Sequence, residues 1–177
     1  MKTPDMTKRG LLAAALLMAA TPAGAQVLGS DAAACSAGGG SAILVQVTGL
    51  KDRKGRIKLE LYPATEADFL KDDDNLVAEG KTFRRVWANT PGSGPVNVCI
   101  RVPRPGRYAL LVTHDRDGKN KFNFFQDGAG FVGTGKLGMS RPKVDQAIID
   151  VGGGTVERTV RMQYLRGLGG FGPVKGD

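Results

Sequence analysis

The sequence predicts an all-β fold, a sandwich of about seven antiparallel strands of the immunoglobulin-like or prealbumin-like kind. In most of its apolar segments, apolar and polar residues alternate with a period of two. Turn signals rich in glycine and proline separate these segments, and scarcely any stretch has helical periodicity. Short alternating segments of this kind are typical of two sheets packed face to face.

The first two strands are predicted in "AILVQVTGL", from Ala42, and in "RIKLELY", from Arg56. In both segments every second residue is a branched aliphatic, and polar or charged side chains, such as Gln46 and Lys58, lie on the opposite face. The short loop between them ends at Gly55, so the pattern predicts a β-hairpin. The residues expected to face inward are Ile43, Val45, Val47, Ile57, Leu59 and Leu61.

The segment after the second strand has a different composition. Pro63 ends the strand, and a short helical turn is expected around Glu66 to Leu70. The acidic triplet Asp72 to Asp74 is interpreted as a solvated turn. A third strand is expected in "KTFRRVWA", with Trp87 in the core.

The next two strands are predicted in "PVNVCIRVP" and "RYALLVTHD", joined by a Pro-Gly turn. Glycine, any residue and tyrosine open the second of them, at Gly106 and Tyr108, which is typical of the tyrosine corner of Greek-key sandwiches. A long loop follows the strand Tyr108–Thr113. A closing hairpin is then expected from "QAIIDV" and "TVERTVRMQYL", joined by three glycines.

The first 25 residues are typical of a secretory signal peptide. A basic head precedes ten apolar residues and an Ala-x-Ala motif, which predicts cleavage after Ala25. The apolar run is too short to span a bilayer, and no later segment is long and apolar enough. We therefore expect a periplasmic or secreted protein. Residues 26–41 are expected to form a flexible arm, 42–165 the β-sandwich domain and 166–177 a flexible glycine-rich tail.

The charge of the chain indicates which partners it could have. The full sequence has a formal net charge of +8. Without the leader, which has three basic residues and one acidic residue, 22 basic and 16 acidic residues remain, a net charge of +6. This balance favours an acidic glycan or another anionic component of the cell envelope. The basic residues form no run of five or more and are not interleaved with aromatic residues, which argues against binding of nucleic acid.

The two cysteines, Cys35 and Cys99, both lie in the mature part of the chain. An exported protein can form a disulfide between them. Such a bridge would tie the N-terminal arm to the outer face of a sheet, because Cys99 is out of phase with its apolar neighbours in the strand. The spacing of the two residues does not by itself show whether they pair.

The loop "HDRDGKN" has the only histidine of the chain and the best candidate site residues: His114, Asp115, Asp117, Asn120 and Asn123. As an EF-hand loop, it has Asp115 and Asp117 at suitable positions but lacks the other ligands. As a catalytic site, it lacks a serine or cysteine partner with a recognisable motif. The third interpretation is structural: the aspartates accept hydrogen bonds from loop amides, and His114 fastens the end of the strand to a neighbouring loop.

This stretch also resembles a family of exported bacterial proteins, domain of unknown function 2141 (DUF2141). The resemblance covers roughly residues 42–165, and the His-Asp loop is its specific part. Members of this family have an aspartate at the position of Asn123. They also have a Pro-x-Glu motif nearby, which the segment "QDGAGF" of this chain lacks. The matching residues are Gly106, Tyr108, Ala109, His114, Asp115, Asp117, Lys121, Gly130, Phe131, Pro142 and Ala147.

The resemblance implies an exported β-sandwich without an established activity. With the residue patterns, it favours a non-catalytic accessory or binding domain of the bacterial envelope. Two alternatives stay open: binding of a divalent cation such as calcium at the loop from His114 to Asp117, with Asp115 and Asp117 as ligands, and binding of an acidic glycan by the basic surface. No cofactor is expected otherwise.

Overall fold

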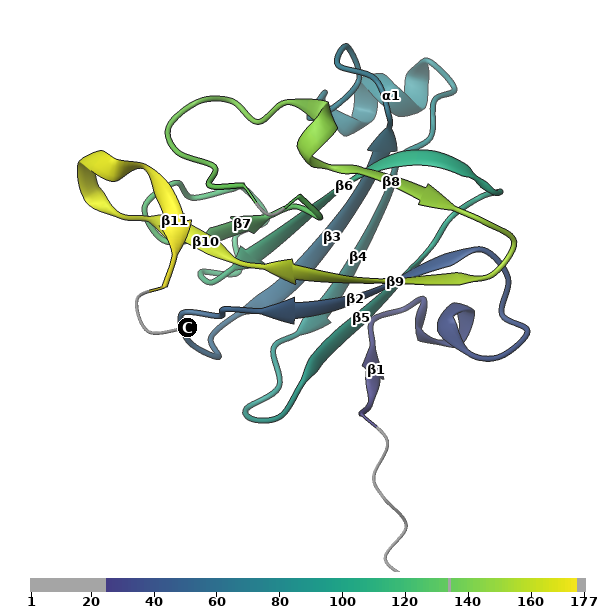
Figure 1. Cartoon of the computed structure of the whole chain (residues 1–177), viewed down its shortest axis with the longest axis horizontal. Helices are drawn as coiled ribbons and strands as arrows, with labels where there is room; N and C mark the ends of the chain where they lie inside the picture. Colours follow the sequence, from purple (N-terminus) through teal and green to yellow (C-terminus); the bar gives the residue numbers. More distant parts are fainter. Residues whose placement is uncertain (1–24, 134, 175–177) are drawn as a thin grey trace, which may run out of the picture.

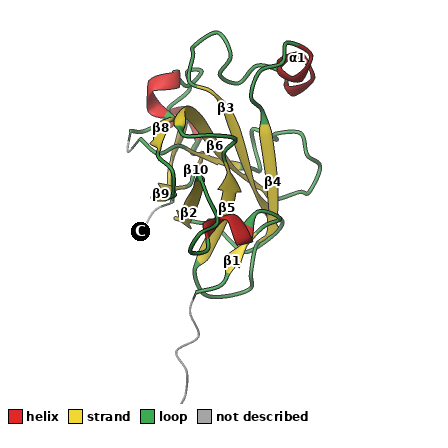
Figure 2. Cartoon of the chain, turned by 90° about the vertical axis from the view of Figure 1, so that its right-hand side faces the viewer, coloured by secondary structure: helices red, strands yellow, loops and turns green. Residues whose placement is uncertain are grey.

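Two β-sheets packed face to face make up the protein, in a computed structural model that describes residues 25–133 and 135–174 (Figures 1 and 2). One sheet has four strands, in the order β1 (Val27–Leu28), β5 (Val96–Arg101), β2 (Ala42–Thr48) and β9 (Thr155–Arg161). The other has seven: β11 (Phe171–Pro173), β10 (Gln163–Leu165), β7 (Gly128–Gly130), β6 (Gly106–Asp115), β3 (Arg56–Pro63) and β4 (Arg84–Asn89), with β8 (Ile148–Val151) paired to β6.

This architecture confirms the predicted all-β sandwich, with two differences in detail. Eleven strands form among the described residues instead of about seven. Two pairings are parallel, β1 with β5 and β2 with β9, whereas an antiparallel fold was expected. The predicted signal peptide lies outside the described residues except for Ala25. No helix in the described part of the chain has the length and apolar character that a membrane span requires.

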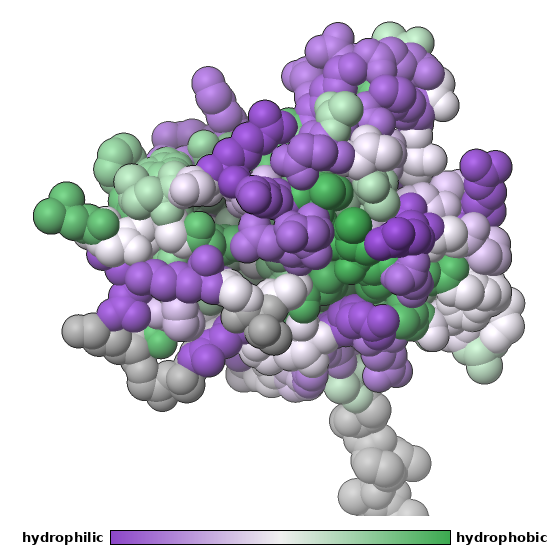
Figure 3. Space-filling view, turned by 45° about the horizontal axis from the view of Figure 1, so that its top comes forward, coloured by the Kyte–Doolittle hydropathy of each residue, from purple (hydrophilic) through white to green (hydrophobic). Residues whose placement is uncertain are grey.

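The core lies between the two sheets and has the residues that the alternation predicts. The six inward-facing residues of β2 and β3 are all buried, and Leu110 and Val112 of β6 lie among them. Each buried aliphatic side chain contributes about 1.5–3 kcal/mol to folding. The surface seen in Figure 3 has hydrophobic residues between hydrophilic side chains, and hydrophilic side chains cover most of the projecting part around α1 (Asp73–Ala78).

Both predicted hairpins are wrong, although their strands exist. β2 pairs with β5 and β9, whereas β3 pairs with β4 and β6, so the loop 49–55 crosses from one sheet to the other. Likewise β8 pairs with β6 and β9 pairs with β2. Alternation with a period of two determines which side chains face inward. Two strands in opposite sheets satisfy it as well as two strands of a hairpin do.

The tyrosine corner is present at the start of β6. The Tyr108 hydroxyl donates a hydrogen bond of 2.8 Å to the carbonyl oxygen of Arg104, four residues upstream. The turn between β5 and β6 is thereby tied down where the chain passes between the sheets. A Cβ atom at Gly106 would meet only the Tyr108 side chain, at ordinary contact distance, so the structure gives no steric reason for glycine there.

Two expectations about the third strand and the segment before it are wrong. The helical turn expected around Glu66 to Leu70 is not one of them: it is present, with the Phe69 N–H donating a hydrogen bond of 3.0 Å to the Thr65 carbonyl oxygen. A separate helix, α1, follows it. Asp72 caps it by accepting hydrogen bonds from two backbone N–H groups, so the acidic triplet begins a helix instead of forming a solvated turn. Trp87 lies half-buried on the outer face of β4, where the Arg56 guanidinium stacks on its ring at 4.0 Å. Its neighbours Val86 and Ala88 occupy the core side of that strand.

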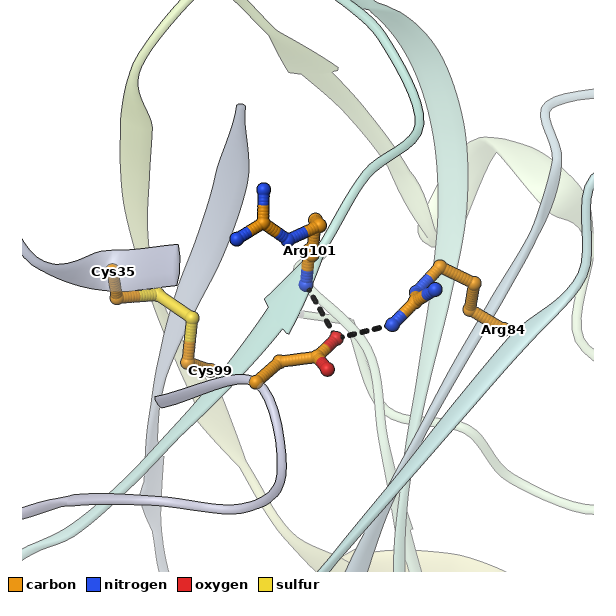
Figure 4. Close-up of a disulfide and its surroundings, with 5 residues drawn as sticks. Cys35, Arg84, Cys99 and Arg101 are labelled. Carbon is orange, nitrogen blue, oxygen red and sulfur yellow. Dashed lines mark hydrogen bonds and ion pairs between the residues drawn. A yellow bond between two sulfur atoms is a disulfide. The ribbon is translucent and has the colours of Figure 1, made fainter. Parts of the chain in front are cut away.

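The N-terminal segment is attached to the four-stranded sheet by a disulfide between Cys35 and Cys99, whose Cα atoms are 6.0 Å apart (Figure 4). The segment expected as a flexible arm in fact contains β1, paired with β5, and the 3-10 helix η1 (Ala32–Cys35). Asp31 adds an ion pair of 2.7 Å with Arg84 and accepts a hydrogen bond from the Arg101 backbone. These contacts together fix the segment to the outer face, as the phase of Cys99 predicted.

The C-terminal segment also has more structure than was expected. It contains the 3-10 helix η3 (Gly167–Gly169) and β11, which pairs antiparallel with β10. The ordered strands therefore extend beyond the predicted domain limits, 42 and 165, at both ends. Only residues 175–177 of the predicted flexible tail lie outside the described residues.

Candidate functional site

His114 and Asp115 point to opposite faces of the seven-stranded sheet, because β6 continues through both of them. The His114 ring is fully buried on the core side. Its Nε2 lies 2.7 Å from the carbonyl oxygen of Lys54, and its Nδ1 lies 2.7 Å from the Tyr164 hydroxyl. Since a carbonyl only accepts, Nε2 carries the proton and Nδ1 accepts from the hydroxyl. The Lys51 backbone in turn donates to that hydroxyl at 3.0 Å.

This network leaves His114 without a free ring nitrogen. Burial lowers the pKa of the imidazole, so the neutral ring is the stable form. Burial also raises the pKa of Tyr164 to about 12. Gly128 makes room for the ring of Tyr164, because a Cβ there would lie 2.5 Å from it. The arrangement joins β6, β10 and the loop 49–55, which suits a structural fastener better than a general base.

A second contact attaches the same loop to the long connection after β6. Arg116 pairs with Asp52 through two nitrogens, and its Nε lies 3.1 Å from both carboxylate oxygens. This hydrogen-bonded guanidinium lowers the pKa of Asp52 to about 2. Arg116 also donates from Nη1 to the carbonyl oxygen of Gln126, which closes the loop 116–127 at its base.

Three carboxylates meet at that base, on the outer side: Asp115, Asp117 and Asp127. One oxygen of each lies within 4.8 Å of the others. Asp115 and Asp127 are almost completely buried, whereas Asp117 is partly exposed. Arg56 holds this cluster against the sheet. Its Nε bonds Asp115 Oδ2 at 3.0 Å, and its Nη2 bonds the carbonyl oxygen of Gly118 at 3.0 Å.

Amide groups of the loop donate several of the hydrogen bonds that the carboxylates of this cluster accept. Asn120 accepts from Arg56 through Oδ1, and its backbone N–H points to Asp115 Oδ2 at 3.4 Å. Asn123 donates from its side chain to Asp117, at 3.2 Å, and from its backbone to Asp127, at 2.8 Å. The hydrogen bond from Asn123 lowers the pKa of Asp117. Four of the five candidate site residues thus lie together, and His114 lies on the other face.

An apolar pocket of about 280 Å³ lies on the same outer face, over β3, β6 and β7. Leu70, Phe122 and Pro142, from three different loops, stand around it. Its base includes Leu111, Thr113 and Ala129, from the strands, and Phe131, directly after β7. A smaller pocket of about 100 Å³ shares Phe122, Ala129 and Pro142 with it and reaches Met139 and Phe171. These two adjacent pockets together are the apolar groove.

Two charged residues of β3 line one side of the pocket, and both are satisfied within the protein. Lys58 Nζ lies 3.0 Å from Glu60 Oε2, and both side chains are almost completely buried. The other oxygen of Glu60 lies 2.7 Å from the Arg85 guanidinium, which also pairs with Asp73 of α1 at 2.8 Å. The pocket therefore presents apolar surface to a ligand, and Lys58 and Glu60 add no unpaired charge to it.

Residues 45–159 match a family described as DUF2141, uncharacterized protein conserved in bacteria. The chain belongs to this family. The match extends from the middle of β2 to the greater part of β9 and includes the cluster of carboxylates, the larger apolar pocket and His114. No curated protein and no solved structure matches the chain. Family membership agrees with the resemblance seen in the His-Asp loop and assigns no activity.

Sequence reasoning missed one carboxylate of the cluster, Asp127, and the arginine that holds the cluster, Arg56. Asp127 precedes β7, and its place follows from the pairing of Gly128 with His114, a contact between distant segments. Arg56 is brought there by its register opposite Asp115. One signal was readable: an alternation continued through "VTHD" would have placed His114 and Asp115 on opposite faces.

Proposed function

We propose that this protein is an exported, non-catalytic binding domain of the bacterial envelope, and that it binds the acyl chain of an anionic amphiphile. The observation that carries this proposal is the apolar groove on the outer face of β3, β6 and β7. Small-molecule sites are concave, mostly apolar and typically about 300–1,000 Å³ in volume. The larger pocket, about 280 Å³, lies just below that range, which suits a slender ligand.

The shape and lining of the groove support an alkyl chain. Its two pockets are adjacent and share Phe122, Ala129 and Pro142, and we propose that an elongated apolar group extends along both. The neighbouring ions Lys58 and Glu60 are already paired with each other, so the ligand gains nothing from placing a charge at the base. Burial of apolar surface contributes about 25 cal/mol per Å².

The surroundings of the groove support an anionic head group. Lys121 precedes Phe122, and Arg141 and Lys143 flank Pro142. Phe125, Met139 and Leu168 are strongly exposed, and hydrophobic atoms are visible at the β10–β11 end of the molecule in Figure 3. Apolar side chains beside basic ones are suited to amphiphiles with a negative head group.

A non-catalytic role is supported by the state of the most reactive side chains. Both ring nitrogens of His114 are engaged, and the two cysteines are joined in a disulfide. The carboxylates at the base of the loop 116–127 face away from the histidine. A histidine held in this way is not available to activate a nucleophile.

Export is supported by the leader pattern and by the disulfide, since disulfides persist mainly in oxidising compartments. We expect the protein purified from the periplasm or the culture medium to begin at Gln26. Mass spectrometry of the intact protein measures this directly, and it also detects the loss of two hydrogens in the Cys35–Cys99 bridge. Retention of residues 1–25 in a cytoplasmic protein would contradict this part of the proposal.

The groove is tested by filling it. Ala129 points outward from β7, so Ala129→Phe places a ring in both pockets without entering the core. We expect a fluorescent long-chain fatty acid to bind the wild type and to bind this variant at least tenfold more weakly. Ala33→Phe, at an exposed position of η1, is the matched control and should bind like the wild type.

Two further measurements complete this test. The long-chain alcohol of the same length should bind more weakly than the fatty acid if the head group meets the basic residues. Circular dichroism shows that each variant keeps the native fold. If the fatty acid does not bind the wild type, or if both variants weaken it equally, the groove is not the binding site.

A further inference from the structure

We propose a second ligand site: a divalent cation, calcium or magnesium, bound by the carboxylates of Asp115, Asp117 and Asp127 at the base of the loop 116–127. The site is distinct from the apolar groove and does not depend on the proposed acyl ligand. Its residues come from the end of β6, from the loop and from the position before β7. They therefore meet only in the folded chain.

The spacing of the three carboxylates fits a hard cation. One oxygen of each lies within 4.8 Å of the other two. Calcium binds oxygen at about 2.3–2.6 Å, so two oxygens on the same ion are separated by at most about 5 Å. Small adjustments of side chains in a loop are sufficient to bring all three oxygens onto one ion.

An orphaned oxygen is the independent observation that points to a ligand. Asp115 Oδ1 is buried and has no hydrogen-bond partner in the described part of the chain. The other oxygen of the same carboxylate takes the Arg56 guanidinium and the Asn120 amide, so the protein itself satisfies only one side of Asp115. A buried polar atom without a partner is rare in folded proteins and calls for an ion or a water molecule.

The charges around the cluster favour a cation over a neutral partner such as a water molecule. The cations near the three carboxylates are Arg56, which bonds Asp115, and Lys119, whose Nζ lies 3.8 Å from Asp117. Arg116 also lies near Asp127, but its guanidinium is paired with Asp52. The Lys119 side chain is 75% exposed and can turn into solvent. Asp115 and Asp127 are 2% and 1% exposed, so their mutual repulsion is poorly screened. A divalent ion would neutralise this buried negative charge.

The donor set determines which cations are expected. All three ligands are carboxylate oxygens, which suit calcium and magnesium. The residues that zinc prefers are elsewhere: His114 is bonded on the core side, and both cysteines are in the disulfide. The site would stabilise the loop that carries Phe122 to the apolar groove.

Titration of the purified, chelator-treated protein with calcium chloride in a calorimeter tests the site. We expect one ion per chain, with a Kd at or below the range of about 10⁻⁴–10⁻³ M found in extracellular modules. Terbium luminescence gives a second readout, excited through Trp87, the only tryptophan of the chain. This ring stacks on Arg56, which is bonded to the cluster.

Two variants and one control make the test specific. Asp127→Asn and Asp117→Asn each remove one negative ligand and should weaken calcium binding at least tenfold. If Asp127→Asn fails to fold, Asp117→Asn at the partly exposed position still decides. Asp150→Asn on β8, whose side chain is 76% exposed, changes the net charge equally and should bind like the wild type. Absence of binding by calcium, magnesium and terbium up to about 10 mM, or equal weakening by the control, overturns the proposal.

Discussion

Replacing Cys35 and Cys99 together with alanine is expected to lower the free energy of unfolding by about 4 kcal/mol. The bridge closes a loop with a sequence separation of 64 residues. In the chain-entropy account, a cross-link of this length stabilises by about 4 kcal/mol, because it restricts the unfolded chain. The loss is large relative to the total stability of a domain, about 5–15 kcal/mol.

Urea unfolding followed by circular dichroism measures this effect. The wild type in reductant should approach the stability of the double variant, whereas the double variant should not respond to reductant. The native attachment of η1 has other contacts, namely the β1–β5 pairing and the ion pair between Asp31 and Arg84. We therefore expect the variant to keep the fold. A decrease below about 1 kcal/mol would show that these contacts alone constrain the segment and that the entropy argument fails here.

The faces of the strands could be predicted from the sequence, but their partners could not. Alternation identified the inward residues of β2 and β3, and all six are buried. The same pattern suggested a hairpin, because it is a local property of each segment. Pairing depends on where the loop 49–55 directs the chain, and that is decided by contacts with β5, β6 and β9. Such contacts between distant segments leave no periodic signal.

The candidate site was predictable to a similar extent. Residues close in sequence, Asp115, Asp117, Asn120 and Asn123, do lie together, because one loop carries them. Asp127 and Arg56 enter through strand register, which the sequence does not reveal. Segments rich in glycine and other small residues gave the opposite error, because they have more ordered structure than their composition predicts. The N-terminal arm and the tail were expected to be flexible from composition, but β1, β11 and the disulfide hold them.

Replacing His114 with alanine is expected to lower the free energy of unfolding by about 3 kcal/mol at neutral pH. The substitution removes the buried ring and leaves a cavity between β6 and β10. It also takes the donor from the Lys54 carbonyl oxygen and the acceptor from the Tyr164 hydroxyl. A buried group that loses its partner costs about 1–3 kcal/mol.

The same residue should determine how the stability of the wild type depends on pH near neutrality. Burial lowers the pKa of folded His114 below the ordinary value of 6.5. As the pH falls below about 6.5, the unfolded chain takes up a proton at this ring and the folded chain does not, so the stability decreases. The decrease continues until the pH reaches the pKa of the folded state, at up to about 1.4 kcal/mol per pH unit.

This pH window separates His114 from the carboxylates, whose ordinary pKa values are about 4. His114 is the only histidine of the chain, and the pKa of Asp52, about 2, lies far below this window. Urea midpoints measured between pH 7.5 and 5 should therefore fall in the wild type and stay nearly level in His114→Ala. Tyr164→Phe removes one partner but keeps the imidazole, so it should be less stable than the wild type and still lose stability as the pH falls. Parallel curves for the wild type and His114→Ala would mean that the ring is protonated equally in the folded and unfolded chains, which a neutral, fully buried fastener does not allow.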